Sequence, residues 1–387
     1  MLVNEFPPLP VGGAEIQAER LATYLADKQW PVWVVTRGAP GLPPVESRNS
    51  FTIIRPLTLG IGKIRTITFM FFTLATLFKL RHHYKVLHAH LAFGPAFVAV
   101  SLGRLLGKRV IVKLGGSGSI GDVKTSQKTL RGRIRLAAIR AWADVVVVLT
   151  DVMRREALTV GISESRIRMF NNGIDASLYM FDISKEDAKH ALSMGGKSLV
   201  LYVGRLDPVK SLSTILDAIA LSRERFPALH FIVVGDGPER VRLEKRIKVL
   251  HLESKVDLVG NQKDVKPYLA AADMFVLPSK TEGISNALLE AMSSQIACLT
   301  TPVGGNLEVL VNGKYGILVP FGDVNAWADK LVEVGIDNDL RERLGRSARE
   351  RVLETYDFNV VGRLYEDLYT ELLKSTPALS TDKRVSR

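Results

Sequence analysis

Cysteine is almost absent from this chain: Cys298 is the single one among 387 residues. No intrachain disulfide can form, and no cysteine-based zinc site can be assembled, so we expect a reducing, cytoplasmic setting. Long apolar runs are also absent, and no signal peptide is recognised. The longest run covers residues 66–78, whereas about 20 apolar residues are needed to span a bilayer. The sequence therefore predicts no membrane-spanning helix.

Negative charge is the scarcer sign. The chain has 52 Lys and Arg against 40 Asp and Glu, a net charge of +12. Such a balance favours anionic partners. Zinc-finger spacing and basic stripes interleaved with aromatics are missing, so nucleic acid is not expected. Acidic lipid surfaces and phosphorylated small molecules remain as candidate partners.

What the sequence does contain is a repeated alternation of Val/Ile-rich runs with helical patterns. Continuous apolar strands between helices predict parallel sheets covered on both faces. The length suits two such domains, so the predicted fold class is α/β with two Rossmann-like, doubly wound domains. The predicted strands are residues 31–36, 85–90, 109–114 and 143–150, and then 198–204, 229–235, 255–260, 273–279, 297–301 and 315–320.

The domain boundary is expected in a polar, glycine-containing stretch around residues 171–197. We expect domains at 1–180 and 181–358, a C-terminal helix at 359–376 that packs back on the first domain, and a disordered tail at 377–387. The first domain needs a strand before residues 4–12, where only three residues are available. Either that strand is very short or the true start lies upstream.

Glycines and cations follow several predicted strands. Gly12 and Gly13 precede a helix, although the spacing is not the dinucleotide fingerprint and a plain turn would also explain them. Arg205 and Lys210 follow the strand at 198–204, at the edge where ligands of open α/β sheets bind. A guanidinium and an ammonium together suit a diphosphate. Gly235 and Gly237 mark another strand end, where a turn is a sufficient explanation.

The stretch TEGISNALLEAM, residues 281–292, combines a helix start with two carboxylates. Ser285 is a suitable N-cap, and the free amides around Asn286, Ala287 and Leu288 predict an anion site. Glu282 and Glu290 would then accept hydrogen bonds from sugar hydroxyls. The ordinary alternatives are a solvated loop charge and an exposed helix residue. Taken together, these loops predict a nucleoside diphosphate sugar bound between the domains.

The chain resembles the retaining nucleotide-sugar glycosyltransferases of family 4. The resemblance covers almost the whole chain and implies the GT-B fold, with an acceptor-binding and a nucleotide-sugar-binding domain facing across a cleft. The matching stretches include PPLPVGGAE, LHAH, YVGRLDPVKS, VVGDGPER, DMFVLPSKTEGISNALLEAM and TPVGGNLEVLVNGKYGILVP.

This resemblance implies a role for each matching residue. Arg205 and Lys210 bind the diphosphate and support its departure, Glu282 lies near the donor sugar hydroxyls, and Glu290 holds the ribose. The backbone from Val259 to Val265 lines the base. The implied catalytic set is Arg205, Lys210 and Glu282, and the implied donor-binding set is Gly12, Gly13, Gly204, Gly235, Gly237, Val259, Gly283, Ser285, Asn286, Ala287 and Glu290.

The resemblance also implies a mechanism without a protein nucleophile. The acceptor attacks on the face that the diphosphate leaves, and a departing phosphate oxygen takes the acceptor proton. We expect no required metal or other cofactor. The only Asp-x-Asp triplet, at residues 337–339, lies between two helical patterns and is more simply a polar loop.

The acceptor side departs from the family pattern. Many members carry a His after the strand that here covers 109–114, whereas this chain has KLGGSGSIGDV. The acceptor-side candidates are His90, Lys113, Ser117 and Asp122. His90 is more simply a satisfied histidine at a strand end, and Lys113 a strand residue whose amine reaches outwards.

Residues 61–85 join the apolar run to Lys63, Arg65, Lys79, Arg81 and Lys85. A basic, apolar helix predicts contact with an anionic membrane surface on the inner face of the cell membrane, and hence a lipid-linked acceptor. A buried helix is the alternative.

The predicted function is transfer of a hexose from a UDP- or GDP-sugar to a glycan or lipid-linked acceptor in polysaccharide, lipopolysaccharide or glycolipid synthesis. A sugar-nucleotide epimerase or hydrolase, or a silent binder, are the alternatives.

Overall fold

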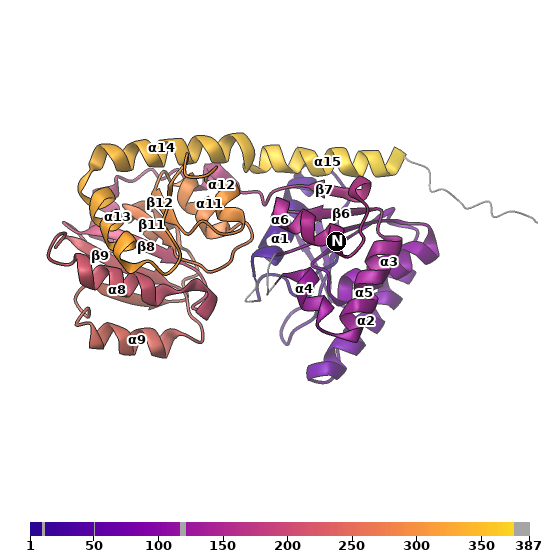
Figure 1. The fold of residues 1–387 in the computed structure, drawn as a ribbon. Coiled ribbons are helices and arrows are strands. Elements are labelled where there is room, and N and C mark those ends of the chain that lie inside the picture. The colour runs from indigo at the N-terminus through magenta and orange to yellow at the C-terminus, as the bar shows by residue number, and fades with distance from the viewer. Residues whose placement is uncertain (10–11, 50, 117–120, 375–387) are drawn as a thin grey trace, which may run out of the picture. The chain divides into compact units, whose positions relative to one another are not determined.

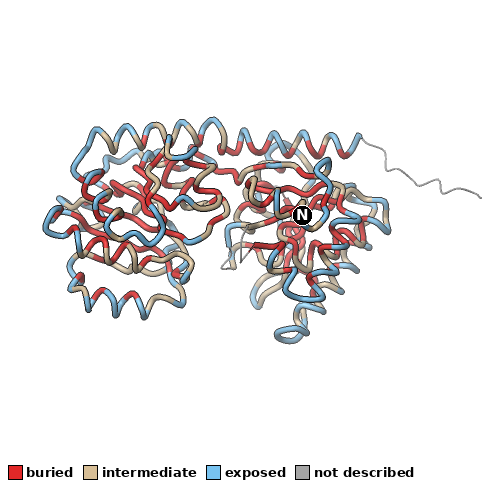
Figure 2. Tube along the Cα trace, in the orientation of Figure 1, coloured by how far each residue is buried: buried red, intermediate tan, exposed pale blue. Residues whose placement is uncertain are grey.

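The computed structural model describes residues 1–9, 12–49, 51–116 and 121–374 (Figure 1). The chain forms two compact units, Met1–Phe170 together with the chain from Val361, and Asn171–Val360. Each unit is a sheet between helices, and the strands are its most buried segments (Figure 2). The α/β fold class with two Rossmann-like units is confirmed.

The sheet of the first unit is completed by the first residues of the chain. Leu2 bridges in parallel to both Val35 and Ala89, and its amide donates to the carbonyl of His88 at 2.8 Å. Residues 1–3 therefore occupy a strand position between β1 and β4. Around them the order is β2, β3, β1, residues 1–3, β4, β5, β6 and β7. The strands are β1 Trp33–Val35, β2 Val45–Arg48, β3 Phe51–Ile54, β4 Val86–His90, β5 Arg109–Lys113, β6 Val145–Val148 and β7 Ile167–Met169.

One edge of this sheet differs from the purely parallel prediction. β2 pairs with β3 antiparallel. The sequence VESR of β2 is half-exposed and mostly polar, so no apolar pattern marks it as a strand. The helices of the unit are α1 Gly13–Asp27, α2 Gly62–Lys79, α3 Gly94–Leu106, α4 Asp122–Gln127, α5 Leu130–Trp142 and α6 Asp151–Thr159.

The second unit has a six-stranded, all-parallel sheet in the order β10, β9, β8, β11, β12, β13. Its strands are β8 Ser198–Val203, β9 Leu229–Val234, β10 Val256–Gly260, β11 Met274–Leu277, β12 Ala297–Thr300 and β13 Ile317–Leu318. Its helices are α7 Lys185–Ala191, α8 Leu212–Ser222, α9 Arg240–Val249, α10 Lys266–Ala271, α11 Asn286–Ser293, α12 Gly305–Val309, α13 Val324–Ile336 and α14 Asn338–Thr355.

In each sheet the chain order reverses at one point. The reversal lies between residues 1–3 and β4 in the first unit, and between β8 and β11 in the second. Loops at the carboxyl ends of the two strands diverge there, which makes these points the usual ligand sites of open α/β sheets.

The last helix, α15 Phe358–Lys374, packs with most of its length on the first unit. Its Glu366 accepts hydrogen bonds from Tyr24 Oη at 2.9 Å and from Trp30 Nε1 at 3.1 Å. Its Tyr369 hydroxyl lies 2.7 Å from His88 Nδ1. Across the described ranges, no helix combines the length and the apolar character needed to cross a bilayer.

Candidate active site

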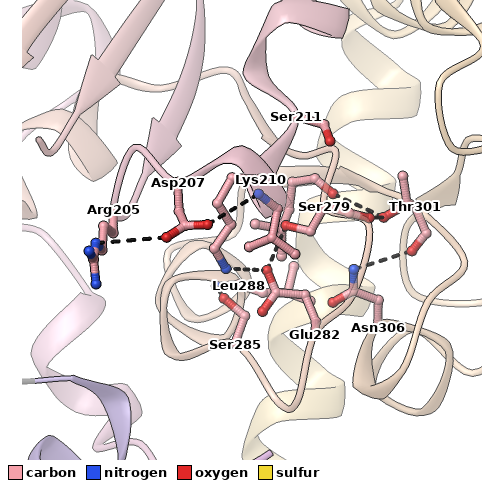
Figure 3. A network of polar contacts seen from close by, with 12 residues as sticks. Arg205, Asp207, Lys210, Ser211, Ser279, Glu282, Ser285, Leu288, Thr301 and Asn306 are labelled. Atoms are coloured by element: carbon pink, nitrogen blue, oxygen red, sulfur yellow. Dashed lines mark hydrogen bonds and ion pairs between the residues drawn. The ribbon is translucent and has the colours of Figure 1, made fainter. Parts of the chain in front are cut away.

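The reversal point of the second unit brings a lysine and a glutamate together (Figure 3). Lys210 follows β8 and Glu282 follows β11, and Lys210 Nζ forms an ion pair with Glu282 Oε1. Ser279 Oγ donates to the same carboxylate oxygen at 2.6 Å. The structure therefore joins two of the three predicted catalytic residues in one polar cluster.

Local capping fixes the position of Lys210. The side chain of Asp207 caps the short 3-10 helix Pro208–Lys210 by accepting from the Val209 amide at 3.2 Å. The carbonyl of Val209 then accepts from the Lys280 amide at 2.8 Å, which ties the loop after β8 to the loop after β11. The ammonium group is therefore held by backbone on both sides.

Glu282 is held by a buried chain of hydroxyls and amides. The residue is 9% exposed. Behind it, Thr301 Oγ1 donates to the carbonyl of Ser279 at 2.6 Å, and Asn306 Nδ2 donates to the carbonyl of Thr301 at 3.2 Å. Ser279, Thr301 and Asn306 were missed by the sequence analysis, although hydroxyls at the ends of β11 and β12 were a usable signal. This support fixes the carboxylate before any ligand arrives.

Arg205 lies apart from that cluster. Its side chain is 73% exposed, and its Nε is 3.9 Å from Asp207 Oδ2, beyond hydrogen-bond distance. In Figure 3 it lies on the far side of Asp207 from Lys210. The guanidinium is therefore available to an anion that approaches the loop after β8.

A buried tyrosine shapes the turn that carries Arg205. Tyr202 Oη donates to the carbonyl of Arg205 at 3.0 Å. Burial, and then the charges of Glu282 and Asp207, raise the pKa of this phenol. The hydroxyl therefore stays protonated and remains a donor to the turn.

The predicted glycines bring strand-end loops into backbone contact. Gly204 and Gly235 have φ angles of 153° and 134°, in the region that favours glycine. A Cβ on Gly235 would overlap the carbonyl oxygen of Gly204, and one on Gly237 would overlap that of Leu206. The structure thus gives these glycines a packing role, and their contact with a nucleotide stays a prediction.

The start of α11 is capped as predicted, with one correction. Ser285 Oγ accepts from the Leu288 amide at 3.3 Å, so this amide does not contribute to an anion site. Asn286 and Ala287 form the first turn, and Glu290 lies further along the helix, half-buried. Gly283 packs against the loop after β12, where a Cβ on Gly305 would overlap its carbonyl oxygen.

Two further predicted donor-side positions lie on other loops. Val259, near the end of β10, is half-buried, and its carbonyl accepts from Gln262 Nε2 at 2.9 Å. In the first unit, Gly12 is the N-cap of α1 and provides no side-chain cap, and both Gly12 and Gly13 are exposed. Contact of Val259, Gly12 and Gly13 with the donor stays a prediction.

Among the acceptor-side candidates, Asp122 is a buried tie between two loops. Its Oδ2 accepts from the amides of Ala92 at 2.8 Å and Gly115 at 3.2 Å, which follow β4 and β5. Burial raises the pKa of this carboxyl to about 6. Ser117 lies outside the described residues.

His90 and Lys113 are paired across β4 and β5, and both are buried. Neither ring nitrogen of His90 has a hydrogen-bond partner in the described part of the chain, so the reading as a satisfied histidine is wrong. Its ring stacks on His88 with centroids 4.4 Å apart, and burial lowers its pKa well below the ordinary range. Lys113 Nζ lies 5.7 Å from the Tyr365 ring centroid, and burial lowers its pKa to about 7. The expectation that its amine reaches outwards is therefore wrong.

The described ranges hold no group of three or more His, Cys, Asp or Glu side chains arranged for a metal ion. The Asp-x-Asp triplet at residues 337–339 forms the start of a helix. Asp337 lies between α13 and α14, and its carboxylate accepts from the Leu340 amide at 2.8 Å as the N-cap of α14.

Comparison with known proteins agrees with this geometry. The family model Glycosyltransferase Family 4 matches residues 11–178, and the model Glycosyl transferases group 1 matches residues 183–351. The chain therefore belongs to the family 4 glycosyltransferases and is a nucleotide-sugar glycosyltransferase.

Particular relatives place it within that family. It is 26% identical over 370 residues to the N-acetyl-alpha-D-glucosaminyl L-malate synthase of Bacillus anthracis, with 94% of this chain and 95% of that protein covered. It is 29% identical over 219 residues to an Escherichia coli UDP-Gal:alpha-D-GlcNAc-diphosphoundecaprenol alpha-1,3-galactosyltransferase, covering 55% and 56% of the two chains. The crystal structure of Anabaena HepE in complex with UDP-glucose shares the fold, with a TM-score of 0.79, 17% identity, and 96% and 98% of the two chains covered.

Proposed function

We propose that this protein transfers a hexose from a UDP-sugar to a glycan or lipid-linked acceptor, with retention at the anomeric carbon and without a required metal. The observation that carries the proposal is the Lys210–Glu282 ion pair at the β8/β11 reversal point, with Arg205 exposed on the same loop. Unit 2 binds the donor and unit 1 the acceptor.

Charge stabilisation is the main contribution of unit 2 to the reaction. Negative charge develops on the diphosphate as it leaves, and Lys210, Arg205 and the first turn of α11 stabilise it. The bond between the anomeric carbon and the phosphate oxygen breaks while the acceptor oxygen bonds to the same face of the sugar. The acceptor proton passes to the departing phosphate oxygen, so no carboxylate needs to act as nucleophile.

The carboxylates recognise hydroxyls. Glu282 accepts hydrogen bonds from the donor hexose, since its support by Ser279 fixes the oxygen positions before the sugar binds. Glu290 accepts from the ribose, and the backbone around Val259 lines the base. Uridine is favoured over guanosine because the galactosyltransferase relative has UDP-Gal in its name and the HepE structure contains UDP-glucose.

In this proposal residues 61–85 contact an anionic membrane surface, and the exposed side chains of α2 support it. Five apolar side chains on one face of α2 are exposed, although the helix is otherwise packed on its unit. No Asp or Glu occurs between residues 47 and 121, so α2 and the segments that flank it in sequence contribute cations and no acids to this surface. The exposed apolar residues are Ile64, Ile67, Phe71, Leu74 and Phe78.

Such a surface fits a cytoplasmic enzyme that is peripheral on the inner face of the membrane. It also fits an acceptor used in polysaccharide, lipopolysaccharide or glycolipid synthesis. The diphosphoundecaprenol acceptor in the name of the Escherichia coli relative supports the same class.

Ligand-dependent stabilisation tests the proposal first. Purified protein is screened by thermal shift and calorimetry against UDP, GDP, ADP and their common sugars, with EDTA or with magnesium. UDP and one UDP-sugar should raise the unfolding temperature. For each ligand, the rise should be the same with EDTA as with magnesium. Selective stabilisation by GDP would overturn the choice of uridine, and a strict need for magnesium would overturn metal independence.

Turnover then separates the alternatives. We expect donor to be consumed only in the presence of acceptor. NMR of the product should show the same anomeric configuration as in the donor. Donor consumed equally without acceptor would indicate a hydrolase or epimerase. Binding without any turnover would indicate a silent sugar-nucleotide binder.

A further inference from the structure

A pocket lies at the reversal point of the first unit. It has a volume of about 680 Å³ and lies between the start of the chain, α2 and α5. Asn4, Arg37 and Phe93 line it from the segments that follow residues 1–3, β1 and β4. Its place in unit 1 therefore corresponds to the place of the Lys210–Glu282 cluster in unit 2.

Two arginines in this pocket lie against aromatic rings, and each has an Nε without a hydrogen-bond partner among the described residues. The Arg37 guanidinium lies 5.3 Å from the Phe69 ring centroid, and that of Arg135 lies 5.6 Å from that of Phe93. The Nε of each is buried and has no hydrogen-bond partner among the described residues. Burial lowers the pKa of both groups, and the ring contacts fix the planes of the forks before a ligand binds.

The remaining charges leave the pocket cationic. The carboxylate nearest to Arg37 is that of Glu5, at 3.8 Å, which is too long for a hydrogen bond. Arg135 Nη2 donates to the neutral Ser126 Oγ at 3.3 Å. The charged side chains that line the pocket are Arg37, Lys63, Arg131 and Arg135 against Glu5 and Glu15. Planar guanidinium groups match the oxygens of a phosphate.

The rest of the lining is apolar and continues onto the surface. Ile67, Met70, Phe97 and Ile134 line the pocket beside the cations. Ile67 belongs to the exposed apolar face of α2 described above, which leads away from the pocket along the helix. A ligand that fills both parts has a charged head and a hydrocarbon chain.

We propose that this pocket recognises the phosphate or diphosphate group of a lipid-linked acceptor, with the hydrocarbon chain lying against α2. Arg37 and Arg135 bind the phosphate oxygens, Lys63 and Arg131 add charge at the rim, and Glu15 is placed to accept from a sugar hydroxyl. The identification of the ligand as the acceptor rests on the proposed function. Binding of an amphiphilic phosphate to the pocket does not, and it can be measured without any transfer reaction.

The test is calorimetry with three soluble probes that share parts of one molecule. Farnesyl diphosphate has both the head and the chain, farnesol has the chain alone, and inorganic pyrophosphate has the head alone. All titrations are run below the micellar range and with excess UDP, so that the proposed diphosphate site of unit 2 is occupied. Wild-type protein should bind farnesyl diphosphate at least about tenfold more tightly than either partial probe, because charge and apolar burial both contribute.

The variants decide where the probe binds. The double variant Arg37→Gln, Arg135→Gln should lose about tenfold or more in affinity for farnesyl diphosphate, the scale of a lost charge-assisted hydrogen bond. The matched control is Arg133→Gln with Arg140→Gln. It removes the same number of charges from exposed positions of α5, the helix that carries Arg135, and should bind like wild type. Thermal unfolding of each variant, with and without UDP, shows whether it is folded and whether its donor site is intact.

Two results would overturn the proposal. Equal loss in both double variants would mean that net charge attracts the probe without a specific site. Pyrophosphate binding as tightly as farnesyl diphosphate would mean that a soluble phosphate is the ligand and that α2 has no part. Failure of wild-type protein to bind UDP would instead contradict the proposed function, and it leaves the comparison of the three probes and the two variants intact.

Discussion

Lys210 and Glu282 lie 72 residues apart and form an ion pair that joins the loops after β8 and β11. In the absence of a donor, each group neutralises the other. Lys210 is 21% exposed whereas Glu282 is 9% exposed, so the ammonium is the member of the pair that a ligand reaches first. The carboxylate thus holds the cation at the place where a diphosphate would meet it.

Removing the cation should therefore reduce turnover more than stability. Lys210→Met keeps the methylene stem and removes the charge, and we expect kcat to fall by more than tenfold and by up to about 10³. Arg205→Ala should also lower turnover by more than tenfold. Lys330→Met is the control, since this exposed lysine pairs with Glu333 on the surface of α13. Normal turnover in both site variants, measured on folded protein, would remove the diphosphate assignment.

Substitutions of Glu282 and Glu290 should differ in their effects on UDP binding and on turnover. Glu290→Ala should weaken binding of free UDP by roughly 1–3 kcal/mol, the scale of a hydrogen bond to a charged group. Glu282→Ala should lower turnover with the UDP-sugar more than it weakens binding of free UDP, because the donor hexose is its expected partner and its contact with UDP is only through Lys210. Calorimetry with UDP and with the UDP-sugar distinguishes the two. Unchanged UDP affinity in Glu290→Ala would exclude the ribose contact.

The sequence predicted the strands of unit 2 closely, and the physical reason is plain. Strands buried on both faces require continuous apolar runs, so residues 229–235 and 273–279 stand out, and β9 and β11 lie within them. The polar β2 left no such trace. Helix starts follow less directly from the pattern. Proline suits a first helical position, yet Pro238 lies in a turn and α9 begins at Arg240.

The candidate site was predictable only where it lies at strand ends. Lys210 and Glu282 are there, next to runs that the pattern reveals. The support of Glu282 by Thr301 and Asn306 was not predictable, since it pairs buried groups that are distant in the chain. Lys113 was misjudged for a similar reason, because its burial depends on Tyr365 of α15, far away in sequence.

The packing role of Gly235 gives a test of the loop framework. In Gly235→Ala, the new methyl group would overlap the carbonyl of Gly204 at a φ of 134°, and we expect a loss of about 3 kcal/mol or more in the free energy of unfolding. Gly196→Ala is the matched control, with a φ of 73° and open space around the methyl group, and should cost about 1–2 kcal/mol. Urea unfolding measures both, and equal losses would contradict the close loop packing.

Burial of Lys113 predicts an unusual rise of stability with pH. Its pKa is about 7 in the folded protein against 10.5 ordinarily, so the unfolded chain binds more protons between these values and stability increases from pH 7 to pH 9. Below pH 6.5, His88 and His90 act in the same direction, and Asp122, with its pKa of about 6, opposes them. Above pH 7 two other buried groups also contribute. The Met1 amine, whose pKa burial lowers to about 5 from 8.0, adds to the rise up to about pH 8, and the Cys298 thiol, whose pKa burial raises, opposes it near pH 9. The difference between wild type and a Lys113 variant therefore isolates the lysine.

Urea unfolding at pH 7, 8 and 9 measures this slope. Lys113→Met should reduce this slope to the part that the Met1 amine and Cys298 leave, and should raise the stability at pH 7. Lys108→Met is the control, because Lys108 also lies near a tyrosine ring, 5.4 Å from the centroid of Tyr84, but is only half-buried. A slope that persists unchanged in Lys113→Met would show that the ammonium is not desolvated.

The exposed apolar face of α2 predicts binding to anionic vesicles. Phe71 and Phe78 are 64% and 46% exposed, so the double substitution Phe71→Ser, Phe78→Ser should cost little folding stability and should remove both aromatic rings of the exposed apolar face. In a flotation assay with phosphatidylglycerol-containing vesicles, we expect at least about a fivefold drop in the bound fraction relative to wild type, since burial of each aromatic ring is worth about 1.5–3 kcal/mol. Leu353→Ser, at an exposed position of α14 in unit 2, should bind as wild type does. Equal binding of the Phe71, Phe78 variant would assign the interaction to charge alone, and no binding of wild-type protein would restrict α2 to the acceptor chain.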